Sequence, residues 1–245
     1  SGLTPGVWTI MAQTSEGSER LMGQLAVELG ERNLDGLVVT VSPPQKFEGS
    51  LGFSGTPPAG QSSVRITLHP SEGIHTGVAT AVVRPDGSFS ISPVYPKKYQ
   101  LDVEGLTGNA YLESVRLGNE EMLGKELDLS AGAAPALQIR ISDKGGSVSG
   151  TAQKDGNPAA GATVLAIPVN AAFRTRQFLR TGSTDAAGAF RLGGLAPMEY
   201  LVMALAEVEY GAWEDPDFLG PLESSAEKVR IEKSATANLQ LKLLP

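Results

Sequence analysis

The feature that most constrains this chain is a short phrase that occurs three times and ends in an aromatic residue. It occupies residues 3–8, 94–99 and 195–200, and in each copy the aromatic residue comes three positions after a proline. A phrase that returns at a spacing of about 100 residues predicts tandem copies of one structural module. At 245 residues, the chain has room for about two domains of ordinary size.

The aromatic residues of the phrase are predicted to be packing anchors. Phe89 lies ten positions before Tyr99, and Phe190 lies ten positions before Tyr200. A tyrosine that enters a buried strand can bury its ring while its hydroxyl bonds to the backbone, as in the tyrosine corner of sandwich domains. We therefore predict structural anchors at Trp8, Tyr99, Tyr200, Phe89 and Phe190.

Short alternating segments follow one another in the same order in the second and third copies. In the third copy, residues 146–152, 161–167 and 239–243 have the pattern of strands, and residues 200–205 form an apolar run of strand length. Such a run is typical of a central strand that is buried on both faces. The 29 glycines and 16 prolines suit many tight turns. The sequence predicts an all-β chain of tandem β-sandwich domains.

Three modules are expected, at residues 1–43, 44–143 and 144–245. The first is incomplete, because it has a central strand at 7–11 and a closing strand at 37–41 with nothing before them. Residues 15–29 fit either a helix or an edge hairpin. A sandwich without its opening strands exposes an apolar face and an unpaired edge, which favours association. The candidate assembly edge comprises Val7, Ile10, Leu37, Val39 and Val41.

Four motifs of the third copy carry a family resemblance. They are G-x-V-x-G at 146–150, P-x-x-G-A-x-V at 158–164, T-D-x-x-G-x-F at 184–190 and L-x-P-x-x-Y at 195–200. The chain resembles the carboxypeptidase regulatory-like, or transthyretin-like, modules of bacterial surface proteins, including large exported proteins of Acidobacteria-type bacteria. The match is looser in the second copy and partial in the first. The resemblance implies immunoglobulin-like or prealbumin-like β-sandwich domains outside the cytoplasm, and it does not imply an enzyme.

Composition argues against several kinds of chemistry. The chain has no cysteine, so it has no thiol nucleophile and no disulfide. A formal net charge of −7 disfavours a nucleic acid partner, and no apolar run has the length of a membrane span. The two histidines, His69 and His75, flank Glu72 in a segment that Pro70 and Gly73 make a loop. Neither histidine lies beside a Gly-x-Ser-x-Gly elbow, so we expect no enzymatic activity, no metal site and no cofactor.

An acidic and aromatic stretch of the third module is a candidate surface for a ligand or partner. Its residues are Tyr210, Trp213, Glu214, Asp215 and Asp217. Oxygen ligands on a loop suit calcium, although the spacing lacks the pattern of an EF-hand. An aromatic platform for a sugar or a protein is a second interpretation, and an ordinary structured loop is a third.

Together these features favour a non-enzymatic structural protein at the bacterial cell surface or outside the cell, with the periplasm and outer membrane left open. One version completes the first module with strands from another copy, so that chains join into a filament. In the other version, neighbouring modules of the same protein supply the strands. The alternative function is a carbohydrate- or peptide-binding adhesion module. A covalent crosslink from Lys144 or Lys154 to Asn238 would be a further stabilising device.

Overall fold

The computed structural model describes residues 3–55, 64–71, 78–131, 135–206, 208–209 and 211–244. The chain folds into two compact units, each assembled from separate stretches. The first unit comprises Ser1–Leu51, Ser62–Glu104 and Arg116–Gln138, and the second comprises Gly52–Gln61, Gly105–Val115 and Ile139–Pro245.

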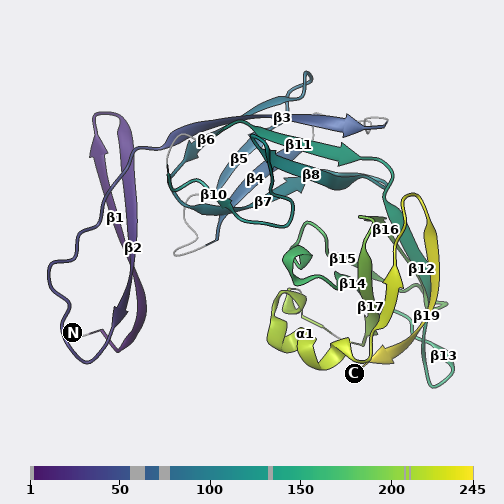
Figure 1. The fold of residues 1–245 in the computed structure, drawn as a ribbon. Helices are drawn as coiled ribbons and strands as arrows, with labels where there is room; N and C mark the ends of the chain where they lie inside the picture. The colour runs from purple at the N-terminus through teal and green to yellow at the C-terminus, as the bar shows by residue number, and fades with distance from the viewer. Residues whose placement is uncertain are drawn as a thin grey trace. The chain divides into compact units, whose positions relative to one another are not determined.

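The architecture is all-β, as the sequence predicts (Figure 1). A two-stranded sheet holds β1 (Gly6–Glu16) and β2 (Glu19–Leu29). A four-stranded sheet has the order β10 (Leu127–Asp128), β7 (Lys98–Glu104), β4 (Arg65–Pro70) and β5 (Ala79–Val82). A five-stranded sheet has the order β6 (Ser88–Val94), β3 (Gln45–Ser54), β11 (Leu137–Ser142), β8 (Tyr111–Leu117) and β9 (Glu120–Glu121).

The strands after residue 145 form one eight-stranded sheet. Its main order is β13 (Asn157–Pro158), β12 (Gly146–Lys154), β19 (Thr236–Leu244), β17 (Glu199–Leu205), β14 (Thr163–Pro168) and β15 (Arg180–Ser183). In addition, β16 (Ala189–Leu195) pairs with β12, and β18 (Glu227–Arg230) pairs with β17. The strand β19 runs parallel to β12 and then, through its last residues, parallel to β17. The strand β19 therefore joins the part of the sheet that contains β12 to the part that contains β17, and the core lies between them.

The strand β17 is buried on both faces, which confirms the prediction made from its apolar run. Tyr200, Val202 and Ala204 belong to the core that β17 shares with β12, β14, β16 and β19. Leu201 and Met203 belong to a second cluster on the opposite face of the strand. Residues of η3 (Ala212–Glu214) and α1 (Pro216–Glu223) cover that second cluster. A short turn of 3-10 helix, η2 (Ala171–Phe173), is the remaining helical element of the described chain. None of the helices in the described ranges has the length and apolarity needed to cross a bilayer.

The same pairing of a glycine with a phenylalanine recurs in the second and third copies. In β3 and β6, Gly49 lies opposite Phe89, and in β12 and β16, Gly150 lies opposite Phe190. A glycine opposite a phenylalanine leaves room for the ring to lie across the neighbouring strand. Both pairs also have a register shift near the start of the first strand, between Gln45 and Phe47 in one and between Gly146 and Val148 in the other.

The aromatic residue of the second phrase is a buried anchor with a backbone hydrogen bond. Tyr99 is fully buried. Its hydroxyl donates to the Tyr95 carbonyl at 2.9 Å and accepts from the Tyr95 amide at 3.1 Å. Burial raises the pKa of Tyr99 above its ordinary value. The hydroxyl therefore closes the turn that leads into β7, as in a tyrosine corner.

Tyr200 is equally buried, and it lies beside the half-buried cation of Arg180. Burial raises the pKa of Tyr200, whereas the charge of Arg180 and the backbone of Ala196 act in the opposite direction. The Arg180 guanidinium donates to the carbonyls of Gln177 at 2.9 Å and Gly194 at 3.1 Å. Desolvation lowers the pKa of Arg180. Carbonyl acceptors thus satisfy a charge that would otherwise be costly to bury.

Candidate functional site

The N-terminal hairpin, residues 3–42, is the part of the chain with the least buried apolar surface. Its strands β1 and β2 pair without a register shift from Gly6 opposite Leu29 to Glu16 opposite Glu19. Met22, which is 7% exposed, is the one side chain of residues 3–42 that is buried. A two-stranded hairpin is marginally stable in water unless a sheet or another layer covers it.

The two faces of this hairpin differ in polarity. Because side chains alternate along a strand, one face carries Trp8, Ile10, Leu25 and Val27, which pair across the strands and are half-buried. The hairpin also exposes large apolar side chains, with Val7 exposed to 78%. The apolar side chains of the hairpin are therefore incompletely covered by the described part of the chain.

The segment after β2 does not form the closing strand that the sequence predicts for residues 37–41. It contributes one isolated bridge, Met22 to Ser42, and otherwise lacks strand pairing. The backbone of Thr40 approaches Gly23 so closely that a Cβ there would lie 2.0 Å from the Thr40 carbonyl oxygen. The segment therefore lies against the hairpin at a glycine, where the missing side chain allows contact without a regular ladder.

The candidate assembly edge is thus divided between two different kinds of structure. Val7 and Ile10 lie in β1, whereas Leu37, Val39 and Val41 lie in the irregular segment. Leu37 is exposed to 44%, and Val39 and Val41 are half-buried.

Two polar contacts hold the hairpin in place. The indole Nε1 of Trp8 donates to the Thr4 carbonyl at 2.9 Å, four residues back, just as Tyr99 bonds back to Tyr95. The Tyr95 hydroxyl donates to the Arg20 carbonyl at 3.2 Å. Trp8 itself is only half-buried, so the anchor of the first copy is incomplete.

The acidic and aromatic stretch of the third module is divided between the core and a helix cap. Trp213 is 8% exposed and packs in the cluster with Leu165 and Met203, which disfavours its use as an aromatic platform. Asp215 caps α1 by accepting from the Asp217 amide at 2.9 Å. Tyr210 and the side chain of Glu214 lie outside the described residues.

The structure offers little support for a metal site or a crosslink. No group of three or more histidine, aspartate or glutamate residues that could hold a metal ion is found within the described ranges. His69 lies 3.4 Å from Asp102 across β4 and β7, while His75 and Glu72 are outside those ranges. Asn238 accepts a hydrogen bond from Ser149 at 2.8 Å, so the neighbour that β12 places opposite it is a serine and not a lysine.

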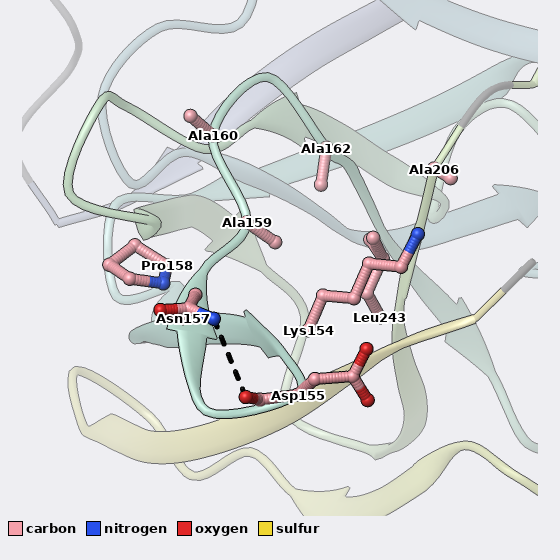
Figure 2. A pocket seen from close by; sticks show the side chains of 9 residues that line it. All are labelled: Lys154, Asp155, Asn157, Pro158, Ala159, Ala160, Ala162, Ala206 and Leu243. Atoms are coloured by element: carbon pink, nitrogen blue, oxygen red, sulfur yellow. Dashed lines mark hydrogen bonds between the residues drawn. The ribbon is translucent and has the colours of Figure 1, made fainter.

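An open pocket of about 620 Å³ lies at one end of the third module, between the β12–β13 turn and the ends of β17 and β19 (Figure 2). Asp155 and Gly156 make the turn with φ of 51° and 82°. The side-chain amide of Asn157 donates to the backbone carbonyl of Asp155 at 3.5 Å. The lining consists of Lys154, Asp155, Asn157, Pro158, Ala159, Ala160, Ala162, Ala206 and Leu243. Its small apolar side chains suit an aliphatic group, and the lining contains no aromatic ring on which a sugar could stack.

A polar cluster around Glu113 ties β8 to β3 and to the turn before β19. The Glu113 carboxylate accepts from the Ser54 hydroxyl at 2.6 Å and from the Lys233 ammonium at 3.2 Å. The Ser54 hydrogen bond, followed by that of Lys233, holds the pKa of Glu113 below its ordinary value. Sequence reasoning missed this cluster, because its members come from three distant segments.

Replacing Glu113 with glutamine should reduce the free energy of unfolding at neutral pH by about 1 kcal/mol. Because the pKa of Glu113 is lowered on folding, its stabilisation is present above the unfolded pKa and is lost as the pH falls through the folded pKa. The variant should therefore lose less stability than the parent between neutral and acidic pH. Urea unfolding at several pH values measures this difference.

The matched control is Glu48→Gln, since Glu48 pairs with Lys46 on the surface, where both side chains are more than half exposed. Such a pair contributes little to stability, so we expect no measurable change. Equal pH profiles for the Glu113 variant and its parent would contradict a stabilising role for the cluster.

Comparison with known proteins assigns the chain to no family. No family model matches the chain, and the search of curated proteins gave no match. Among solved structures, the minor pilin GBS52 of Streptococcus agalactiae aligns with 81% of this chain and 97% of its own, at 14% identity and a TM-score of 0.32. A streptococcal ancillary pilin aligns with 99% of this chain and 76% of its own, at 10% identity and a TM-score of 0.33.

The major pilin subunit BcpA of Bacillus cereus gives a similar result, with 91% of this chain and 84% of its own covered at 10% identity and a TM-score of 0.28. At such scores the overlap does not define a shared arrangement of elements. The resemblance to carboxypeptidase regulatory-like modules of Acidobacteria-type proteins is not confirmed by a family match.

Proposed function

We propose that this chain is a non-enzymatic structural protein of the bacterial cell surface or extracellular space, built from β-sandwich modules in series. The modules are those at 44–143 and 144–245, preceded by the N-terminal hairpin. Its function is to assemble with further copies through that hairpin. The single observation that carries the proposal is the hairpin's long ladder with almost no buried side chain.

The physical argument is that exposed apolar surface and open strand edges are costly unless a partner covers them. Four of the large apolar side chains of the hairpin segment, Val7, Leu34, Leu37 and Val38, are exposed to between 42% and 78%. Val7 lies in β1 and the other three lie in the irregular segment after β2, and soluble proteins rarely leave a large apolar patch uncovered. The absence of cysteine is compatible with export, since such a chain needs no disulfide chemistry.

A glycan- or peptide-binding module is the second candidate. The pocket beside Lys154 favours an aliphatic side chain of a peptide over a sugar, because the apolar part of its lining consists of small side chains and contains no aromatic ring. Trp213 does not favour this function, because its indole is part of the core.

The proposed function is tested by two matched valine variants. Val7→Glu places a charge on the exposed hairpin, and Val82→Glu places the same charge on β5, where the valine is 55% exposed. We expect Val7→Glu to weaken self-association of the full chain by about tenfold or more, whereas Val82→Glu leaves it unchanged. Light scattering over a concentration series gives the dissociation constants. Equal effects of the two variants would place the association surface outside the hairpin.

A further inference from the structure

The strand β1 lacks a neighbour that its counterparts have. In the second phrase, β7 lies between β10 and β4, with antiparallel pairing on both sides. In the third, β17 pairs antiparallel with both β14 and β18. The strand of the first phrase, β1, has β2 as its single ladder partner in the described part of the chain. By the pattern of the repeat, the other edge of β1 is a place for an antiparallel strand.

The hydrogen bonds of β2 show which residues of β1 face that edge. The Met22 amide donates to the Ser42 carbonyl at 3.0 Å, and the Ser42 amide donates to the Met22 carbonyl at 2.9 Å. The backbone N–H and C=O groups of Met22 therefore point away from Gln13, the residue opposite it in β1. In antiparallel pairs, hydrogen-bonded and non-hydrogen-bonded positions alternate along each strand. The backbone groups of Gln13, and by alternation those of Thr9, therefore point to the open edge.

The charge pattern of β1 suits a second copy of the chain. Each copy has a formal net charge of −7, so two copies repel each other except where their surfaces are neutral. The eleven residues of β1 include one charged residue, Glu16, at the end of the strand. Exposed edges usually carry lysine, proline or a bulge that prevents pairing, and β1 has none of these.

A self-pairing register exists that keeps the apolar face continuous. If Gln13 of one copy lies opposite Thr9 of the other, both residues use the backbone groups that point to the edge. In the same register, Trp8 and Ile10 of both copies lie on one side of the joined sheet, because opposite residues in antiparallel strands point to the same face. Glu16 then lies opposite Gly6 and meets no second carboxylate.

We infer that β1 pairs antiparallel with β1 of a second copy, which joins two hairpins into a four-stranded sheet with Gln13 of each opposite Thr9 of the other. The inference rests on the proposed function, because it names the partner and the register of the assembly surface. Such a contact is isologous, so it yields a dimer, and growth into a filament requires a second surface.

The absence of cysteine makes a crosslinking experiment on the full chain free of background. Thr9→Cys and Gln13→Cys are prepared as separate single variants, mixed, and oxidised under mild conditions. A hydrogen-bonded antiparallel pair has its Cα atoms about 5.5 Å apart, within the range that a disulfide spans. Two copies of the same variant place their cysteines about 13 Å apart, four residues along the strand, which is too far.

The expected result is a disulfide-linked dimer in the mixture and no disulfide-linked dimer with either variant alone. Light scattering of the unoxidised samples shows whether association has taken place. Association without the mixed crosslink would overturn this register and leave the proposed function standing. A disulfide-linked dimer from Thr9→Cys alone would indicate either parallel pairing or a different antiparallel register, and it would also overturn the proposed register. A monomer at every concentration would overturn both the register and the proposed function.

Discussion

Replacing Tyr99 with alanine should lower the free energy of unfolding by about 4 kcal/mol, the largest effect that we expect from one side chain. The ring is fully buried, and its hydroxyl accepts from the Tyr95 amide and donates to the Tyr95 carbonyl. The alanine variant loses the packing of the ring and both hydrogen bonds. Tyr99→Phe keeps the ring and should cost about 2 kcal/mol, because it leaves buried backbone groups without a partner. Urea unfolding measures both values.

Trp8 provides the control for this prediction, since it occupies the same position in the first phrase. Its indole also bonds four residues back, to the Thr4 carbonyl, but the contact is exposed. Trp8→Phe should therefore change the free energy of unfolding by less than about 0.5 kcal/mol. If Trp8→Phe lowered the free energy of unfolding as much as Tyr99→Phe does, the difference in burial between the two aromatic residues would be contradicted.

Gly150→Ala should destabilise the third module by about 3 kcal/mol. A Cβ at this position would lie 1.8 Å from the Leu239 carbonyl oxygen, so the parallel strands β12 and β19 would have to move apart. The clash is with backbone, which cannot rotate away as a flexible side chain can. Thermal unfolding followed by circular dichroism measures the loss.

Gly52→Ala is the matched control, because this glycine also lies in a strand and has no atom within 4 Å of a Cβ built on it. We expect no loss of stability there, or a small gain from the reduced freedom of the unfolded chain. If Gly150→Ala were as stable as Gly52→Ala, β12 and β19 would not pack as closely as the structure has them.

The periodicity of the sequence was sufficient to predict most strands of the second and third copies. Strands rich in alternating apolar residues, such as β3, β12 and β19, carry their own signal. The strand β8 was not predicted, because its sequence, YLESVRL, shows no simple alternation. The pairing of Gly49 with Phe89, repeated at Gly150 and Phe190, depends on register, which the sequence does not display.

The covering of β17 by a helix was also missed, although a signal for it exists. Asp215 followed by Pro216 is typical of a helix start, with a capping side chain before a proline in the first turn. The acidic residues nearby instead suggested a binding surface, and the burial of Trp213 could not be read from one sequence. The helix explains why β17 has apolar side chains on both faces.

The secondary structure around the candidate assembly edge differs in part from the prediction. Val7 lies exposed on the hairpin. The prediction of a strand at residues 37–41 is wrong. The apolar alternation of that segment does not become a ladder, because its backbone meets β2 only near Met22 and Gly23. Local pattern predicts strand propensity, whereas pairing also requires a neighbouring edge in the correct register.

The most direct test of the central claim, that this chain assembles with copies of itself, is its mass in solution. Light scattering coupled to size exclusion should be recorded on the native full chain over a wide range of concentrations. We expect a mass that rises with concentration from 25.6 kDa to at least twice that value. A constant mass of 25.6 kDa at every concentration would contradict it, and the exposed hairpin would then require a different partner.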